Sequence, residues 1–334
     1  MSRYYIAADG GGSKLEAILY NEDLQIIRRT SATGVNTLFK PTEIVRKNIE
    51  NMVAALLDGI DAANAHIVAD LCIVGARDIV NEVLSRYIPK EKLHFHSEPV
   101  VALAAALKTD GVVALSGTGS DAFFVRGGQV KSTVGGWGPL LGDEGSGYDI
   151  GLNAIRAAIY SFDGRGQKTM LYDLVMEKWG LTELWDIIAH LAHNPDVRHE
   201  IASAAKLCAF AANVGDEVAL GIYDMAAKDL ALQVKKVIEP NCDDFSGSAV
   251  IMGGAWKGCP YMLERFAYHV HKAYPNAKIE KPIFEPVLGC VVLRCMRDGL
   301  DNADTYAQIR ENFADYLYER QEMEKYDERN SKLL

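Results

Sequence analysis

The sequence has no long uninterrupted apolar run, and this absence argues against a membrane protein. Its longest apolar stretch is broken by Lys108-Thr109-Asp110, whereas a membrane-spanning helix needs about 20 consecutive apolar residues. The first residues, MSRYYIAADGGG, also lack the apolar core of a secretory signal. We therefore expect a cytoplasmic protein without a membrane partner.

Cysteines are few, and their spacing is not that of a metal or disulfide framework. The chain has 6 cysteines in 334 residues, with no CxxC pair and no Cys/His metal pattern. Several lie in apolar runs, as core cysteines do. His94 and His96 alternate along an expected strand, where two side chains at a strand edge are a commoner arrangement than a metal pair. We expect no disulfide or metal framework.

Basic segments are missing too. The chain has 35 Lys and Arg residues against 45 Asp and Glu, a net charge of −10 and a pI near 5.3. This balance argues against nucleic acid or an anionic membrane as a partner. An anionic nucleotide would have to be held by backbone amides and a metal ion. The length exceeds what one core normally organises, so we expect two domains.

Glycine, by contrast, is concentrated in Val134 to Ile150, VGGWGPLLGDEGSGYDI, around the stiff Trp137. Apolar residues at helical spacing follow from Tyr148 to Tyr160. Carboxylates and free backbone amides at a helix start can bind Mg²⁺, ligand hydroxyls and anions. Taken alone, the loop fits a structural turn equally well. Its acidic residues are Asp143, Glu144 and Asp149.

A second glycine turn, DGGGSK at residues 9–14, separates two expected strands at 4–8 and 15–20. Its amides could grip a phosphate, with Ser13 as hydroxyl donor, Lys14 as counter-charge and Asp9 as a Mg²⁺ ligand. It lacks the GxxxxGK[ST] spacing and the strand-to-helix context of the common nucleotide motifs. A plain hairpin is the alternative interpretation.

The same arrangement returns at Ser116-Gly117-Thr118-Gly119-Ser120, between expected strands at 112–115 and 122–125. Two glycine hairpins about a hundred residues apart predict two related halves, each with a phosphate-binding turn. Gly253-Gly254, which close an expected strand at 249–252, could let an adenine ring lie against the backbone. A strand-to-helix turn is the plainer interpretation there.

The remaining pattern is that of an α/β protein, with strands first in hairpins and then alternating with helices. A helical region separates the glycine-rich loop from the late strand at 249–252. Further strands are expected at 24–30, 67–74, 93–97 and 129–134. Further helices are expected at 41–57, 98–107, 171–179, 184–192, 201–213, 217–237, 260–273 and 286–296, with an amphipathic tail from 302.

DGGGSK, GTGS, GGWGPLLGDEGS and MGGAW occur in this order at domain-scale spacing. Together they resemble the actin, heat-shock chaperone and sugar kinase ATPase superfamily, and within it the N-acetylglucosamine kinase and BadF/BadG/BcrA/BcrD ATPase group. The resemblance covers nearly the whole chain. It implies two ribonuclease-H-like (actin-like ATPase) α/β domains around a nucleotide cleft. We expect them at residues 1–109 and 110–301, the second with a helical insertion, and a C-terminal helix at 302–325 docked on the first.

The resemblance also implies roles for individual residues, with ATP and Mg²⁺ as cofactors and a small sugar as substrate. The implied nucleotide contacts are Gly11, Gly12, Ser13, Lys14, Gly117, Thr118, Gly119, Ser120, Gly253 and Gly254, with Asp9 as the Mg²⁺ carboxylate. The implied sugar contacts are Asn36, Asp121, Gly136, Trp137 and Asp143. The implied general base is Glu98, with Asp143 as the next choice.

Two of these positions depart from the family pattern. The usual base is an aspartate; the extra methylene of Glu98 keeps the carboxylate chemistry but changes its reach, which matters where the geometry of attack is strict. The residue after GTGS is asparagine in related sugar kinases, whereas this chain has Asp121. An added carboxylate favours a substrate amine, or different hydroxyls, in place of an acetamide.

Three functions follow from this pattern. An ATP-dependent sugar or amino sugar kinase is favoured, because Asn36 and the GGWG sequence are of the sugar-binding type. The alternative is an ATPase that activates a partner enzyme through an iron–sulfur cluster, although neither the GTGS turn nor the tryptophan loop contains a cysteine. A non-catalytic sugar or nucleotide sensor is the third. The sequence leaves open which sugar is used and whether the protein is a homodimer.

Overall fold

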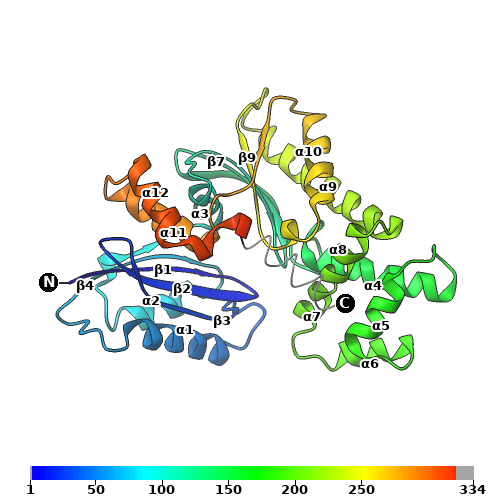
Figure 1. The fold of residues 1–334 in the computed structure, drawn as a ribbon, viewed down its shortest axis with the longest axis horizontal. Coiled ribbons are helices and arrows are strands. Elements are labelled where there is room, and N and C mark those ends of the chain that lie inside the picture. The colour runs from blue at the N-terminus through cyan, green and yellow to red at the C-terminus, as the bar shows by residue number, and fades with distance from the viewer. Residues whose placement is uncertain (1, 321–334) are drawn as a thin grey trace. The chain divides into compact units, whose positions relative to one another are not determined.

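The computed structural model describes residues 2–320, which form two compact units (Figure 1). Of the described residues, those up to Thr109 and those from Pro282 to 320 form the first unit, and those from Asp110 to Lys281 form the second. The division after Thr109 is where we expected it, but the expected end of the second domain at residue 301 is wrong. Helix α11 (Pro286–Arg297) belongs to the first unit because it packs on that unit's sheet and on α3 (Glu98–Ala105).

A five-stranded sheet of order β3-β2-β1-β4-β5 forms the centre of the first unit. Antiparallel pairing joins the first three strands, and β4 and β5 run parallel to β1. Apolar faces of α1 and α2 cover one side of the sheet, while α11 lies on the other (Figure 1). The elements are β1 (Arg3–Gly10), β2 (Lys14–Asn21), β3 (Ile26–Thr33), α1 (Thr42–Leu57), β4 (His66–Ile73), α2 (Arg77–Leu84) and β5 (Leu93–Phe95).

The second unit repeats this sheet. Its order, β10-β9-β6-β7-β8, reads in reverse as three antiparallel strands and then two parallel ones, as in the first unit. The predicted relation between the two halves therefore extends from one hairpin to a whole sheet, and the two-lobed actin-like α/β fold class is confirmed. The strands are β6 (Gly111–Ser116), β7 (Ser120–Arg126), β8 (Gln129–Gly135), β9 (Ser248–Met252) and β10 (Lys278–Glu280).

Helices separate β8 from β9, as expected. Two of them, at residues 187–192 and 205–213, begin later than the apolar patterns at 184–192 and 201–213 predict. The pattern at 201–213 continues across a break at Ala204, where α7 gives way to α8. A Cβ on Gly151 would lie 2.1 Å from Ile201 O, so α4 packs against the backbone at this break. The helices are α4 (Gly147–Asp163), α5 (Leu171–Trp179), α6 (Ile187–Ala192), α7 (Val197–Ser203), α8 (Ala205–Asn213), α9 (Glu217–Ile238) and α10 (Pro260–His271). Within residues 2–320, no helix is long and apolar enough to cross a membrane.

The chain then returns to the first unit. Gln308 and Asn312 of α12 (Ala303–Asn312) donate hydrogen bonds to the backbone oxygens of Asp23 (2.8 Å) and Leu24 (3.0 Å). Phe313 meets Tyr20 edge to face, with 5.8 Å between ring centroids. The tail packs on the first unit as predicted, but the continuous helix predicted at 302–325 is wrong, because α12 ends at Asn312, a 3-10 turn follows at Ala314–Tyr316, and Leu317 pairs with Phe284. The part of this prediction beyond residue 320 lies outside the described residues.

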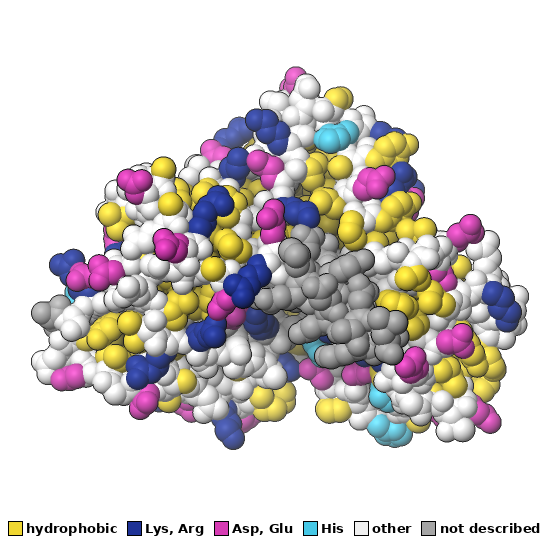
Figure 2. Space-filling view, in the orientation of Figure 1, with side chains coloured by type: hydrophobic (Ala, Val, Ile, Leu, Met, Phe, Trp, Pro, Cys, Tyr) yellow, Lys and Arg dark blue, Asp and Glu magenta, His cyan; other side chains and the backbone are white. Residues whose placement is uncertain are grey.

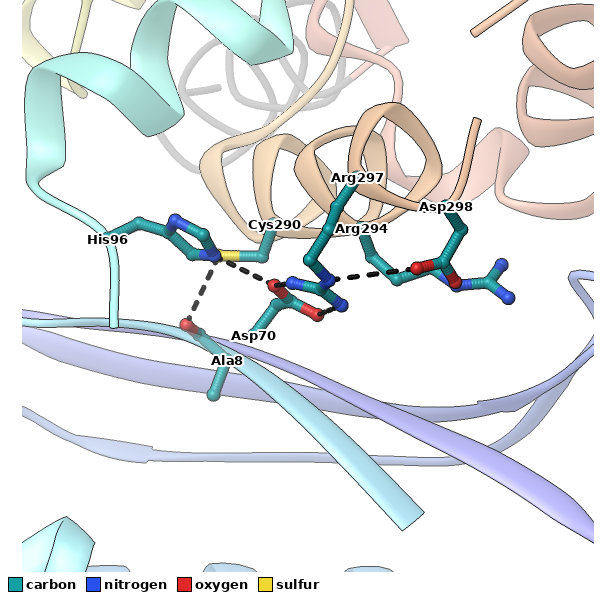
Figure 3. A network of polar contacts seen from close by, with 7 residues as sticks. All are labelled: Ala8, Asp70, His96, Cys290, Arg294, Arg297 and Asp298. Carbon is teal, nitrogen blue, oxygen red and sulfur yellow. Dashed lines mark hydrogen bonds and ion pairs between the residues drawn. The ribbon is translucent and has the colours of Figure 1, made fainter. Parts of the chain in front are cut away.

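A buried carboxylate ties α11 to the sheet of the first unit (Figure 3). Asp70 of β4 is 1% exposed and accepts hydrogen bonds from His96 Nε2 at 2.8 Å and Arg297 Nη2 at 2.9 Å. Burial acts to raise the pKa of Asp70, but the bonds from His96 and Arg297 outweigh it and leave that pKa below its ordinary value. His96 is therefore hydrogen-bonded to a buried carboxylate, and no group of three metal-ligating side chains occurs among the described residues.

We expect Asp70→Asn to lower the free energy of unfolding by about 2 kcal/mol at pH 7, because Arg297 loses its two charged hydrogen bonds to Asp70 and keeps only the more distant Asp298, at 3.7 Å, as a counter-charge. A lowered folded-state pKa contributes stability above the unfolded value, roughly 4, that is lost as the pH falls through the folded value. Urea unfolding at pH 7 and below pH 4 should therefore show the two proteins converging in acid. The surface variant Asp163→Asn is the control and should keep the wild-type midpoint. An Asp70→Asn midpoint equal to that of the wild type at pH 7 would contradict the assignment.

Candidate functional site

Asp9, the predicted Mg²⁺ carboxylate, is the last residue but one of β1 and pairs with Cys72 of β4. Burial raises the pKa of Asp9 to about 6; the hydrogen bond from the Cys72 thiol opposes this, and the nearby charge of Glu16 adds to it. A single hard carboxylate suits Mg²⁺, which usually takes one or two protein carboxylates and completes its shell with water and nucleotide phosphates. The residues at this position therefore fit the ion.

The first glycine turn is held in place by the segment after β3. A Cβ on Gly34 would lie 2.0 Å from Gly12 O, and Val35 N donates to Gly11 O at 2.8 Å. Lys14, predicted as a counter-charge for phosphate, instead directs its ammonium to Glu16 at 2.6 Å, with 60% of the side chain exposed. The turn itself is shaped by packing, whereas the lysine lies in a surface ion pair.

Asn36, a predicted sugar contact, is buried and partly committed to its own loop. Its Oδ1 accepts the N–H of Leu38 at 2.9 Å, while Thr37 Oγ1 donates to Gly75 O at 2.6 Å. Gly75 has a φ of +82°, and a Cβ there would lie 2.2 Å from Asn36 Oδ1. Gly75 was not among the predicted site residues, although its place at the end of a buried strand could have indicated it.

Glu98, the predicted base, is the first residue of α3 and is half-buried. Pro99 follows at the helix start, as the sequence predicts. Burial raises the pKa of the Cys72 thiol, and the charges of Asp9 and Glu98 raise it further. The predicted metal carboxylate and the predicted base therefore lie near the same thiol.

The second glycine turn packs against the start of α4. Gly147 N donates to Gly117 O at 2.8 Å, Tyr148 N to Thr118 O at 3.4 Å, and Asp149 N to Ser146 Oγ at 3.1 Å. These amides already have acceptors, so the free helix-start amides expected from the sequence are not available to an anion.

Asp149 is occupied as well, since its carboxylate accepts Gly145 N and Asn153 Nδ2, both at 2.9 Å. This side chain therefore braces the loop at the start of α4.

Gly253 brings the end of β9 against the second turn. Its φ is +114°, and a Cβ would lie 2.3 Å from Ser116 O and 2.8 Å from Gly117 N. Only glycine permits this approach. The predicted adenosine border is therefore in direct contact with the predicted phosphate turn.

We expect Gly253→Ala to lower the free energy of unfolding by about 2–4 kcal/mol, from backbone strain and overpacking together. Its matched control is Gly254→Ala, because Gly254 has an ordinary φ and a Cβ there meets nothing within 4 Å. Urea denaturation of both variants measures the difference. Equal midpoints for the two would show that the contact between β9 and the second turn is not close.

Asp143 is deeply buried, with 2% exposed. Its φ is +63°, and its Oδ2 pairs with Arg198 Nη2 of α7 at 3.2 Å. A Cβ on Gly119 would lie 2.9 Å from Asp143 Oδ2 and 3.1 Å from Arg198 Nη2. The phosphate turn, the carboxylate and a guanidinium therefore meet at one point. Arg198 was not among the predicted site residues, because nothing in the local pattern of α7 marks it.

Asp121 and Gly136, both predicted sugar contacts, are neighbours across β7 and β8. A Cβ on Gly136, whose φ is +72°, would lie 3.0 Å from Asp121 Oδ2. Burial raises the pKa of Asp121 to about 7, and the charge of Asp143 adds to this.

Trp137 is 74% exposed beside Leu140 at 90% and Leu141 at 78%. The tryptophan loop therefore presents apolar side chains to solvent, with two carboxylates at its base.

The cysteines are not paired with one another, and the charged side chains on the drawn face are of both signs. All six cysteines are free thiols, and five of them are buried. On the face drawn in Figure 2, Lys and Arg side chains are interspersed with Asp and Glu, and no continuous basic patch is seen.

Comparison with known proteins identifies the family of this chain. Residues 8–293 match the model of the BadF/BadG/BcrA/BcrD ATPase family. The chain belongs to this family. The resemblance inferred from the glycine and tryptophan motifs is thereby confirmed.

Within and around the family, the chain is similar to named kinases. It is 29% identical over 302 residues to N-acetylmuramic acid/N-acetylglucosamine kinase of Clostridium acetobutylicum, covering 87% of this chain and 98% of that protein. It is 26% identical over 309 residues to N-acetyl-D-glucosamine kinase of Dictyostelium discoideum, with 86% and 97% covered. The predicted enzyme class, an ATP-dependent sugar kinase, agrees with the activities named for these relatives.

The fold agrees too. A putative N-acetylglucosamine kinase from Porphyromonas gingivalis superposes with a TM-score of 0.69 at 17% identity, covering 88% of this chain and 99% of that chain. At this identity the likeness concerns the fold alone.

Proposed function

We propose that this family member transfers the γ-phosphoryl group of ATP to a hydroxyl of a sugar or amino sugar. The observation that carries the proposal is the contact of the buried Asp143 with Gly119 of the second glycine turn. A carboxylate that can bind a substrate hydroxyl thus lies against a turn that can bind phosphate, which is the juxtaposition that phosphoryl transfer needs. The named activities of the relatives support the same conclusion.

In the proposed reaction, the glycine turns at 11–13 and 117–120 hold the nucleotide phosphates. Asp143 orients the acceptor sugar, with Asn36 and the Gly136-Trp137 backbone as further contacts. Glu98 accepts the proton of the attacking hydroxyl, whose oxygen then bonds to the γ-phosphorus as the bond to the ADP oxygen breaks. Mg²⁺, held by Asp9 and the phosphates, would supply positive charge to the transferred group. Mg²⁺, the residue roles and a cytoplasmic location remain predictions.

ADP release in the presence of Mg·ATP and each of glucose, glucosamine and N-acetylglucosamine tests the proposal against a control without sugar. We expect release to depend on at least one of these sugars. ATP hydrolysis at the same rate with and without sugar would contradict the proposal and point to the partner-activating ATPase. Sugar binding without ADP release would contradict it in favour of a sensor.

A further inference from the structure

The segment from His96 to Glu98 joins the short strand β5 to α3. β5 spans only three residues, Leu93–Phe95, and within residues 2–320 it pairs only with β4. His96 N adds one more backbone hydrogen bond, to Leu71 O at 2.8 Å. Ser97, the residue before α3, makes no capping hydrogen bond with its side chain. A short edge strand and a helix start without a side-chain cap leave the direction of this segment to be set by other contacts.

The imidazole of His96 supplies such a contact (Figure 3). Its Nε2 lies 2.8 Å from Oδ1 of Asp70, which is 1% exposed and whose Oδ2 accepts a hydrogen bond from Arg297 at 2.9 Å. Asp70, with its lowered pKa, is ionised and can only accept, so Nε2 is the donor. The carboxylate cannot turn away from His96 without losing Arg297 as well. The side chain of His96 is therefore bound to a fixed point in the unit.

This fixed point lies beside the residues with which Glu98 is proposed to work. Asp70 and Cys72 are two positions apart on β4, so their side chains leave the same face of the sheet about 7 Å apart along the strand. His96 binds the first of them, and the charge of Glu98, two residues further along the chain, acts on the thiol of the second. Asp9 is paired with Cys72 in the register of β1 and β4. The bond from His96 to Asp70 therefore holds the segment that carries Glu98 where it runs past Cys72.

The first turn of α3 is held separately by α11. A Cβ on Gly289 of α11 would lie 2.2 Å from Val101 O, so the two helices are in backbone contact there. This contact does not involve the imidazole. Loss of the His96 bond should therefore leave α3 packed on α11 and loosen only the segment at its start.

We propose that His96 is a positioning residue for Glu98, whose carboxylate it holds in place through its hydrogen bond to Asp70. This inference rests on the proposed kinase function and adds a residue to its machinery. A general base must lie within hydrogen-bond reach of the proton that it accepts, and a displacement of about 1 Å can cost a hundredfold in rate. His96 touches neither sugar nor nucleotide in this proposal. Its loss therefore acts on kcat and leaves the KM for ATP unchanged.

Two substitutions separate the hydrogen bond from the bulk of the ring. His96→Leu fills much of the same space without a donor, whereas His96→Gln places an amide nitrogen near the position of Nε2. We expect His96→Leu to lower kcat by about ten- to a hundredfold, and His96→Gln to restore it to within about threefold of the wild type. The KM for ATP should stay the same in both. His94→Leu is the matched control and should keep the wild-type kcat, because His94 lies on the same strand but its ring does not donate to Asp70.

Hydrogen exchange follows the same segment without turnover. The backbone amides of Val100 and Val101 both donate to Ser97 O at 3.1 Å, and mass spectrometry of a peptide covering residues 93–101 measures their exchange. In His96→Leu we expect exchange to quicken by about tenfold, the factor that one lost hydrogen bond to a charged group accounts for. In His96→Gln it should return toward the wild-type rate. If His96→Leu does not fold, His96→Asn replaces it, because its amide nitrogen takes the place of Nδ1 and does not reach the carboxylate.

A wild-type kcat in His96→Leu would overturn the positioning role, whatever the exchange rate. Equal losses of kcat in His96→Leu and His96→Gln would overturn it too, because the shape of the ring and not its hydrogen bond would then matter. In either case sugar-dependent ADP release by the wild type would leave the kinase function standing. If no sugar supports ADP release by the wild type, the kinase proposal fails by itself. Exchange then decides whether His96 holds the Glu98 segment, and a wild-type rate in His96→Leu would overturn that.

Discussion

Replacing Glu98 with glutamine is expected to lower kcat by about a hundred- to ten-thousandfold while ATP and sugar still bind, because a general base commonly contributes that much. Glu98 lies at the start of α3 and shares with Asp9 an electrostatic effect on the Cys72 thiol. Glutamine keeps the side-chain length but cannot accept the hydroxyl proton. Steady-state kinetics with saturating sugar measure kcat, and the thermal shift with ATP confirms that nucleotide binding survives.

Replacing Glu98 with aspartate, which keeps the carboxylate but shortens the side chain, is the more informative substitution. Glu98→Asp should retain more turnover than Glu98→Gln if the carboxylate chemistry matters, and less than the wild type if the backbone at Ser97 and Pro99 is built for glutamate. Full sugar-dependent turnover in Glu98→Gln would show that the base lies elsewhere, with Asp143 as the next candidate.

Asp143→Asn should raise the KM for sugar by about a hundredfold, since it replaces the buried carboxylate that we propose binds the substrate hydroxyl. Asparagine tolerates the φ of +63° at this position, so the loop should keep its shape. The KM for ATP should change little. This pattern differs from that of Glu98→Gln, where the loss falls on kcat.

Steady-state kinetics with varied sugar at saturating ATP separate the two effects, and Asp163→Asn is again the control. An Asp143→Asn variant with an unchanged KM for sugar would place the carboxylate outside the sugar site. Its pairing with Arg198 would then be structural only.

Much of the fold is readable from the sequence because most elements are long and strongly periodic. The apolar runs at 4–8 and 112–115, each followed by a glycine turn, predict the central hairpins of both sheets. Two short elements, α2 and β10, were not predicted. They contain too few residues to show a clear hydrophobic periodicity. The placement of α11 could not be predicted either. It depends on the pairing of Arg297 with Asp70, more than two hundred positions away in the chain.

The site is predicted less completely than the fold. Glycine-rich turns are visible because strand ends and close approaches such as Gly253 demand glycine. Arg198 and Gln233 lie on ordinary helical patterns, and only the packing of α7 and α9 brings Arg198 to Asp143 and Gln233 to Gly135. The sequence predicted free backbone amides at the first turn of α4 that could bind an anion. In the structure these amides donate hydrogen bonds to the carbonyl oxygens of Gly117 and Thr118.

The fate of the γ-phosphoryl group tests the central claim most directly. Phosphorus NMR of the protein turning over Mg·ATP with glucosamine resolves sugar phosphate from inorganic phosphate. The account predicts one sugar phosphate for each ADP formed, and no product of either kind at a comparable rate when the sugar is left out. Inorganic phosphate appearing in step with ADP, with no phosphorylated sugar from glucosamine, N-acetylglucosamine or glucose, would contradict it.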